Sequence, residues 1–453
     1  MTHPTRKGVL NLLGVMLLTG NLAAGPWEPL FNGKDLTGWK EVNGTAPYAA
    51  ADGMIVSTTA PGSPNSFLAT EKTYGDFIFE CEVKQDVGPS NSGVMFRALS
   101  TPDYMKGRVH GYQMELESGT RAWAGGIYDE ARRGWMYPGD LNPAGQKAYR
   151  YGEWNHIRIE AIGHTLRTWI NGVPIAHLID ALTPTGFIAL QVHSIGNNPE
   201  NAGRRISWRN LRIQITDLVP SPAAGIFVRS FVPNTLADAE RATGWRMLWD
   251  GQTGQGWRSA KGTEFPATGW SIADGALTVL GLKGEAKGGD IVTTEEFSAF
   301  ELQLEFQVTE GANSGIKYFV APDGKGAPVG LEFQLIDDER HPDAKAGVDG
   351  NRTTASLYDL IPRGKQPGGA AIKPEAGKWQ HARIVVTPAG HVEHWLNGIK
   401  VVEFERGSAD FAARVARSKY AKIPGFGQGA KGPILLQDHG DVVKFRSIKV
   451  RKL

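Results

Sequence analysis

Acidic and amide side chains alternate with apolar ones in one segment of the second half of the chain. An extended strand there presents Glu332 and Gln334 on one face, and a twist or bulge adds Asp337 to that face. Further along, Gln437 and His439 also share a strand face. Carboxylates and imidazoles are the groups that exchange protons near neutral pH, so these residues form a candidate acid–base site. The alternative is the solvated outer face of a sheet.

The first half of the chain has a similar arrangement. Glu115 and Glu117 share a strand face with Gln113 beside them, and Gln191 and His193 follow later. A single histidine on such a strand is more often structural. Its occurrence with an acidic strand in both halves favours a site over a solvated face.

A second group of residues suits a ligand rich in hydroxyl groups. Tyr128 and Glu130 are followed by Arg133 and Trp135, and Tyr358 has a similar position in the second half. Aromatic rings stack on the C–H face of a sugar, while guanidinium and carboxylate groups bind its hydroxyls. A surface hairpin with incidental charges is the alternative.

Asparagines and an acidic loop complete the candidates. Asn91 and Asn313 each begin an Asn-Ser-Gly turn between strands and have the position to line a concave face. The acidic loop 337–343 offers oxygen ligands for a divalent cation such as Ca²⁺. It lacks the EF-hand spacing, so an ordinary solvated loop is the simpler interpretation, and neither metal ligands nor a cofactor are assigned.

The elements that position these residues occur twice. Five short motifs recur in the same order, including Asn91-Ser-Gly93 with Asn313-Ser-Gly315 and Trp169-Ile-Asn-Gly172 with Trp395-Leu-Asn-Gly398. A repeat of this kind indicates a duplicated domain. We predict copy one at 26–216, a proline-containing linker at 217–242, and copy two at 243–453.

Within each copy the hydrophobic pattern has a period of two, as in half-buried strands. Asn171-Gly172 and Asn397-Gly398 predict two-residue hairpins, and only 408–419 suggests a helix. The predicted fold class is therefore all-β, with two tandem jelly-roll β-sandwiches.

Composition excludes several functional classes. The chain has 453 residues, 49 Lys and Arg against 47 Asp and Glu, and no basic run, which argues against a nucleic-acid partner. Its single cysteine, Cys81, excludes a disulfide framework and alternates into a predicted core strand. The oligomeric state is left open.

The N-terminus predicts export. Residues 1–24 combine a basic start, a short apolar run and small residues, the order of a signal peptide. The apolar run is too short to span a bilayer, and no later segment is long enough. We expect a mature protein that is periplasmic or extracellular, with a retained signal anchor as the alternative.

The motifs together resemble a known family. Phe31-Asn-Gly-Lys-Asp-Leu-Thr-Gly-Trp39, the Asn-Ser-Gly turns, Trp395-Leu-Asn-Gly398 and Leu436-Gln-Asp-His-Gly440 are similar to the bacterial 3-keto-disaccharide hydrolases, also described as 3-keto-glucoside 1,2-lyases and 3-keto-2-hydroxy-glucal hydratases. The resemblance covers nearly all of both copies and implies concanavalin A-like jelly rolls, export, and action on glycosides oxidised at C3. Copy two is closer to the family pattern.

Such chemistry needs an acid–base pair and a group that stabilises an enolate, either hydrogen-bond donors or a divalent metal. For copy two, the candidate catalytic residues are Glu332, Asp337 and His439, and the candidate binding residues are Gln334, Tyr358, Gln437 and Asn313. For copy one, the catalytic candidates are Glu115, Glu130 and His193, and the binding candidates are Tyr128, Arg133, Trp135, Gln191 and Asn91. A non-catalytic, lectin-like pair of carbohydrate-binding modules is the second hypothesis, and an adhesion scaffold is the third.

Overall fold

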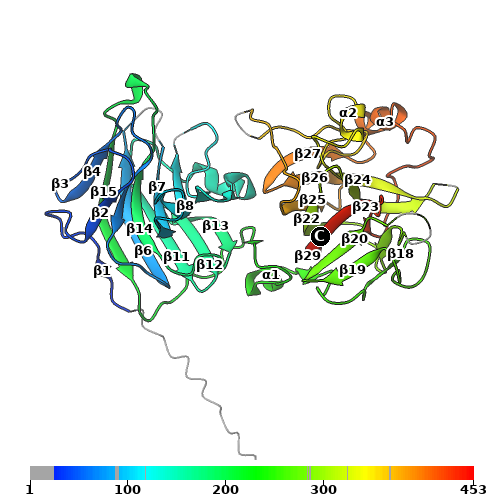
Figure 1. The fold of residues 1–453 in the computed structure, drawn as a ribbon, viewed down its shortest axis with the longest axis horizontal. Coiled ribbons are helices and arrows are strands. Elements are labelled where there is room, and N and C mark those ends of the chain that lie inside the picture. Colours follow the sequence, from blue (N-terminus) through cyan, green and yellow to red (C-terminus); the bar gives the residue numbers. More distant parts are fainter. Residues whose placement is uncertain are drawn as a thin grey trace, which may run out of the picture.

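A computed structural model describes residues 25–86, 91–117, 119–282, 284, 287–323, 325–366 and 369–453. The predicted signal peptide, 1–24, lies outside the described residues. Two β-sandwiches lie side by side (Figure 1), joined by one connecting segment, and each is made of two sheets whose strands pair antiparallel except for β13 (Val173–Ile179) with β16 (Arg229–Ser230). The predicted all-β fold with two tandem jelly-roll sandwiches is confirmed. Among the described helices, none is both long and apolar enough to cross a membrane.

Copy one is built from a nine-stranded and a seven-stranded sheet. The larger sheet has the order β16 (Arg229–Ser230), β13 (Val173–Ile179), β12 (Thr165–Ile170), β11 (Asn155–Ile162), β6 (Phe77–Gln85), β15 (Arg205–Gln214), β4 (Met54–Thr58) and β3 (Tyr48–Ala51), with β1 (Glu28–Pro29) paired to β15. The smaller sheet has the order β10 (Gly134–Tyr137), β9 (Ile127–Glu130), β8 (His110–Glu117), β7 (Asn91–Leu99), β14 (Phe187–Val192), β5 (Ser66–Thr70) and β2 (Trp39–Val42). Three short 3₁₀ helices are described here, η1 (Gly139–Leu141), η2 (Pro143–Lys147) and η3 (Pro199–Asn201).

Copy two repeats this plan with an eight-stranded and a five-stranded sheet. The larger sheet has the order β19 (Trp270–Ala273), β20 (Ala276–Leu280), β29 (Val442–Lys452), β22 (Phe300–Val308), β25 (Gln380–Val386), β26 (His391–Leu396) and β27 (Ile399–Glu405), with β17 (Arg246–Met247) paired to β29. The smaller sheet has the order β18 (Trp257–Ser259), β21 (Ile291–Thr293), β28 (Leu435–Leu436), β23 (Asn313–Pro322) and β24 (Pro328–Ile336). The helices α2 (Asp343–Ala346) and α3 (Ala409–Ala416) lie outside the sheets, and α3 falls within the predicted helical stretch.

The segment predicted as a linker, 217–242, is partly structured. It contributes β16 to copy one and then forms the short helix α1 (Asp238–Ala242) beside copy two (Figure 1). Buried Glu240 of α1 forms an ion pair with Lys449 of β29. Because this pair is buried and the strand joins a sheet, the segment is held against both copies.

The two sandwiches are also in direct contact. Trp123 of copy one belongs to the apolar core of copy two, and Trp395 of copy two belongs to the core of copy one. The guanidinium of Arg229 donates to the carbonyl oxygens of Met136 at 2.6 Å and Asn397 at 3.2 Å, one on each side. Val385 of copy two also belongs to the core of copy one. Each copy otherwise has its own core, and Cys81 is buried in that of copy one, as predicted.

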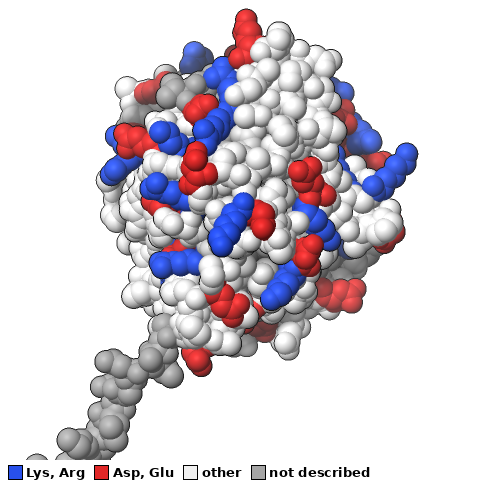
Figure 2. All heavy atoms as spheres, turned by 90° about the vertical axis from the view of Figure 1, so that its left-hand side faces the viewer, with Lys and Arg blue, Asp and Glu red and all other residues white. Residues whose placement is uncertain are grey.

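Charge is mixed on the face of copy one shown in Figure 2. Positive and negative side chains are interspersed there rather than gathered into a basic area. This agrees with the composition, since the chain has 49 Lys and Arg residues and 47 Asp and Glu residues. Clustered cations, which an anionic polymer requires, are not present on this face.

The two predicted hairpin turns have equivalent geometry. Asn171 and Gly172 have φ of 51° and 79°, and Asn397 and Gly398 have φ of 53° and 86°. The Asn397 side-chain oxygen accepts from the backbone N–H of His381 at 2.8 Å, as Asn171 does from His156 at 2.9 Å. Both positions need positive φ, which is why Asn-Gly occurs here twice.

The hairpin of copy two provides a stability prediction. Asn397→Ala should lower the free energy of unfolding by about 1–3 kcal/mol, because alanine is strained at positive φ and loses the side-chain hydrogen bonds. Asn397→Gly loses the same hydrogen bonds without the strain, so it should cost less. Urea unfolding of both variants measures the difference. Equal destabilisation would contradict a role for backbone strain.

Candidate functional site

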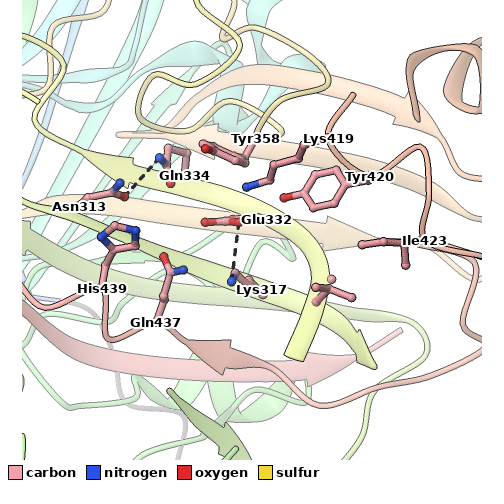
Figure 3. A pocket seen from close by; sticks show the side chains of 12 residues that line it. Asn313, Lys317, Glu332, Gln334, Tyr358, Lys419, Tyr420, Ile423, Gln437 and His439 are labelled. Carbon is pink, nitrogen blue, oxygen red and sulfur yellow. Dashed lines mark hydrogen bonds and ion pairs between the residues drawn. The ribbon is translucent and has the colours of Figure 1, made fainter. Parts of the chain in front are cut away.

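A pocket with a volume of about 240 Å³ lies on the smaller sheet of copy two. Its walls come from β23, β24, the segment after β28, the loop that carries Tyr358 and the segment after α3 (Figure 3). The side chains that line it are Asn313, Lys317, Val329, Gly330, Glu332, Gln334, Tyr358, Lys419, Tyr420, Ile423, Gln437 and His439. All of the candidate residues of copy two except Asp337 are in this set.

The centre of the pocket is an acid beside a lysine. Glu332 of β24 is the register partner of Lys317 of β23, and its Oε2 lies 4.0 Å from the lysine Nζ. Glu332 is only 5% exposed, so burial raises the pKa of its carboxyl above the ordinary value, and the charges of Lys317 and Lys419 offset this only in part. The group is therefore set up to exchange a proton closer to neutral pH than an exposed glutamate.

The neighbouring strand is shaped to admit this carboxylate. Gly315 lies between Asn313 and Lys317 on β23, and a Cβ atom added to it would be 2.3 Å from Oε1 of Glu332. Any side chain at position 315 would therefore push the carboxylate out of place. The predicted Asn-Ser-Gly turns are wrong, since both motifs begin strands, β7 and β23, and the glycine of β23 provides space for the carboxylate rather than a turn.

A second lysine approaches from the opposite side. In Figure 3 the Nζ of Lys419 and the hydroxyl of Tyr420 point toward Glu332 from the segment that follows α3. Lys419 Nζ lies 4.0 Å from the ring centroid of Tyr358, and its backbone N–H donates to Asp359 at 2.8 Å. Burial lowers the pKa of Lys419, although the charge of Glu332 opposes the shift.

The ring of Tyr358 is fixed by a charged network behind it. Its hydroxyl donates to Asp343 Oδ2 at 2.7 Å, and Arg352 donates to Asp343 Oδ1 at 2.7 Å. Burial and the hydrogen bond to Asp343 both raise the pKa of Tyr358, so the phenol stays neutral and protonated. This arrangement holds the ring against Lys419 and forms one wall of the pocket.

Amide groups and a histidine line another part of the pocket. Gln334 Nε2 donates to Asn313 Oδ1 at 3.3 Å, while Gln437 and His439 follow β28 (Figure 3). His439 lies at the exposed rim of the pocket. Burial of part of its ring lowers the pKa of His439, nearby positive charges lower it further, and the charge of Asp441 opposes the shift. At neutral pH His439 is therefore a neutral imidazole at the mouth of the pocket.

The structure does not bring Asp337 into this group. Its carboxylate accepts backbone N–H groups of Gly311 at 2.8 Å and Glu339 at 3.0 Å, and it pairs with Arg340. Burial alone would raise the pKa of Asp337, but these donors lower it, so it stays ionised. Asp337 stabilises the start of the acidic loop instead of lining the pocket.

The acidic loop is also engaged elsewhere. Asp338 pairs with Arg363 at 2.8 Å and Asp343 with Arg352 at 2.7 Å, so these carboxylates already have cationic partners. Within the described residues, possible metal ligands gather only at His391, Glu393 and Glu403. Lys400 is ion-paired with both glutamates of that group. No metal site is assigned.

Copy one has a pocket of about 280 Å³ at the equivalent place on its smaller sheet. The residues that line it are Asn65, Asn91, Arg108, Gln113, Glu115, Arg121, Tyr128, Glu130, Trp135, Gln191 and His193. Arg133 is not among them, because its guanidinium pairs with Asp129 at 2.6 Å and Asp180 at 2.5 Å away from the pocket. Every other candidate residue of copy one is in this set.

Strand register shows which residues of the two acidic strands correspond. Glu115 is the partner of Gly93, and in copy two the partner of the equivalent Gly315 is Gln334. The counterpart of Glu332 is therefore Gln113, not Glu115. Acid and amide have exchanged places between the copies.

The same register places Met95 of copy one where copy two has Lys317, since Met95 pairs with Gln113. Two important pocket residues, Lys317 and Lys419, were missed from the sequence. The alternation from Gly315 to Lys317 on one strand face was a usable signal for the first. Lys419 follows helix α3, in a stretch of copy two where no repeat or periodicity indicates a site.

Comparisons with known proteins agree with the duplication. The sequence profile of a family described as 3-keto-α-glucoside-1,2-lyase-like domains matches residues 26–214 and again 244–451. A 3-keto-disaccharide hydrolase of Bacteroides thetaiotaomicron is 36% identical over 237 residues, which cover 47% of this chain and 79% of that protein.

Solved structures with similarity to this chain include two bacterial proteins. One is described as a candidate glycosyl hydrolase of Parabacteroides distasonis, with 30% identity, a TM-score of 0.43, and coverage of 49% of this chain and 99% of that one. Another is the carbohydrate-binding module CBM66 of Bacillus subtilis, with 16% identity, a TM-score of 0.28, and coverage of 39% and 95%.

Proposed function

This chain belongs to the 3-keto-α-glucoside-1,2-lyase-like family, with two copies of the family domain, and from that premise we propose that it hydrolyses glycosidic bonds of 3-keto-glycosides in the pocket of copy two. The relative of 36% identity is a 3-keto-disaccharide hydrolase, which supports a disaccharide-sized substrate of the same class. The pocket of about 240 Å³, with lysines, amides and aromatic rings, suits one sugar ring bound through its hydroxyl and keto oxygens.

The proposed chemistry uses the ketone. A carbonyl at C3 acidifies the hydrogen on C2, so a base removes that proton and leaves an enolate. The enolate then expels the glycosidic oxygen from C1. This oxygen takes up a proton and departs with the aglycone, and the sugar remains as a 2-hydroxy-glucal ketone. Water then adds at C1 while C2 regains a proton, so the net reaction is hydrolysis.

The residues divide between these tasks according to position. Glu332 takes the C2 proton, because it is a buried carboxyl with a raised pKa at the centre of the pocket. Lys317 and Lys419 stabilise the enolate oxygen with positive charge from two sides. His439 lies at the open rim through which an aglycone would depart, and its neutral imidazole can relay a proton from water to the leaving oxygen. Tyr358 holds the ammonium group of Lys419 against its ring and so positions this lysine in the pocket.

One observation carries this proposal, the buried Glu332 carboxylate 4.0 Å from Lys317 in a pocket walled by amides. A binding module needs hydrogen-bond donors and acceptors but has no need of a protonatable acid beside a lysine. The test is to incubate the purified protein with a 3-keto-disaccharide and with the parent disaccharide. We expect 3-keto-glucose or its glucal from the first only. Sugar binding without any turnover, with and without divalent cations, would favour the lectin-like alternative.

A pH prediction follows from the charge around Glu332. As a base it acts when ionised, so kcat/KM should rise as the pH increases through its raised pKa. Lys419→Met removes a positive charge that lowers this pKa, so the acidic limb should move to higher pH, by up to about one unit. Lys422→Met, which changes an exposed lysine three residues away, is the control. A limb that stays in place in Lys419→Met would exclude Glu332 as the titrating base.

We also propose that the protein is exported, on the basis of the pattern in residues 1–24. Expression in a bacterial host, followed by fractionation and N-terminal sequencing of the recovered protein, tests this. Recovery in the periplasm or medium with a new N-terminus near residue 25 is expected. Recovery in the cytoplasm with residues 1–24 intact would refute it.

A further inference from the structure

The pocket of copy one contains buried polar atoms without partners. Gln191 is 0% exposed and Gln113 1% exposed, and both side chains line the pocket. Among the described residues, neither Nε2 nor Oε1 of Gln191 has a hydrogen-bond partner, and the same holds for Oε1 of Gln113 and Oδ1 of Asn91. Leaving one such group unpaired costs about 1–3 kcal/mol, so this set indicates a site built for a polar occupant.

The orientation of these amides is fixed by Glu115. Asn91 Nδ2 donates to Glu115 Oε1 at 2.6 Å, and Gln113 Nε2 donates to Oε2 at 2.9 Å. Both amides therefore use their N–H groups on the carboxylate and turn their oxygens elsewhere. The unpaired set is rich in acceptors with one donor, Gln191 Nε2. Hydroxyl groups, which both donate and accept, satisfy such a set better than a carboxylate or phosphate would.

The charges of this pocket are nearly balanced, because burial raises the pKa of Glu115 to about 8 and leaves its carboxyl largely neutral at pH 7. Arg121 pairs with Glu117, with its Nε at 2.8 Å from Oε1, and Arg108 pairs with Glu130 at 3.2 Å. No lysine takes the place of Lys317, because Met95 occupies the equivalent position. A balanced pocket favours a neutral ligand over an anionic one.

An aromatic wall completes the site. The ring of Trp135 lies edge-on to Tyr128, with centroids 5.3 Å apart, and to Trp123 at 4.7 Å. Arg121 lies over Trp135 with its Cζ 4.8 Å from the ring centroid. Trp135 is half-buried, so part of its surface faces the pocket, where it can pack on the C–H face of a sugar.

We infer that the pocket of copy one binds a neutral, polyhydroxylated ligand, a glycoside or oligosaccharide, and does not cleave it. Cleavage is assigned to copy two by the proposed function, and copy one lacks its two central groups. Gln113 stands where copy two has Glu332, and an amide cannot take a proton from C2. The nearby carboxyl of Glu115 stands in place of Gln334, and both of its oxygens already accept amide N–H groups. Met95 stands in place of Lys317 and cannot stabilise an enolate oxygen.

The test uses the full chain with copy two disabled by Glu332→Gln. Trehalose, maltose, cellobiose, sucrose and their 3-keto forms are titrated calorimetrically into this protein. We expect binding of at least one of them, with a component that weakens by about tenfold or more when Gln191→Ala is added. No turnover of the 3-keto sugars is expected in the Glu332→Gln protein. Gln303→Ala is the matched control. Like Gln191, Gln303 is a buried strand glutamine with an unpartnered amide nitrogen among the described residues, but it lies in the larger sheet of copy two, outside both pockets.

Trp135→Ala provides a second variant at the rim, in case Gln191→Ala fails to fold, and should weaken the same component. Binding that neither variant weakens, or no binding of any probe, would overturn the inference. Turnover that survives Glu332→Gln and disappears with Gln191→Ala would make copy one catalytic and overturn it as well. If the wild type cleaves no 3-keto-glycoside but the Gln191-dependent binding persists, the proposed function fails and the binding site in copy one stands.

Discussion

Glu332→Gln is expected to lower kcat/KM for a 3-keto-disaccharide by about 10²–10⁴-fold, the usual contribution of a positioned general base. Glutamine has nearly the same shape but cannot accept the C2 proton. The fold should tolerate it, because copy one carries glutamine, Gln113, at the equivalent register position. The measurement is steady-state kinetics on the purified variant, with its thermal unfolding compared to wild type.

The size of the effect separates two roles for the carboxylate. If Glu332 only accepted a hydrogen bond from a sugar hydroxyl, glutamine would replace most of it, and the loss would be about tenfold or less. Glu310→Gln is the control, since Glu310 is a mostly exposed glutamate near the start of β23 whose side chain pairs with Arg340. Activity within a few-fold of wild type in Glu332→Gln would remove Glu332 from the mechanism.

Local pattern was enough to predict the strands and the hairpins. The alternation along 331–335 and the two Asn-Gly turns depend on neighbouring residues only, and both are present in the structure. The sharing of a pocket by Glu332, Gln437 and His439 followed from the repeat, because both copies keep the same order of strands. Repeated motifs and strands with an alternating hydrophobic pattern can therefore be predicted from the sequence.

The correspondence of the two acidic strands is also readable from the sequence. Aligning Gln113-Met-Glu115 with Glu332-Phe-Gln334 places the acid two residues apart in the two copies, and the ladders agree with this alignment. A shift of two residues keeps a side chain on the same face but moves it along the pocket. The contact of Glu332 with Lys317 was not predicted, because it depends on how the partner strand pairs.

The prediction that Asp337 lies in the pocket was wrong because of the turn that follows the strand. Strand alternation with a bulge placed it on the pocket face, but the strand ends at Ile336 and the carboxylate accepts the backbone N–H groups of the following turn. Aspartate is favoured at such positions because its short side chain reaches the backbone two or three residues on. The acidic loop therefore has a structural explanation that competes with catalysis.

Lys317→Met is the second variant expected to have a large effect, a loss of about 10²–10³-fold in kcat, as for removal of one group that stabilises an oxyanion. Methionine is what copy one has at the equivalent position, Met95, so the sandwich should accept it. Steady-state kinetics on a 3-keto-disaccharide, with circular dichroism as the check on folding, measures the loss. Lys325→Met, which changes an exposed lysine on the β23–β24 hairpin, is the control.

The same substitution has a signature that a loss of sugar binding would not produce. Lys317 lowers the pKa of Glu332 by its charge, so Lys317→Met should also move the acidic limb of kcat/KM to higher pH. Lys317→Arg keeps the charge and should keep the limb close to its wild-type position, even if the bulkier group slows the reaction. A higher KM with unchanged kcat and an unchanged pH profile would mean that Lys317 only holds the sugar. A lower kcat with a displaced limb would support one electrostatic unit in which the lysine both tunes the base and stabilises the enolate.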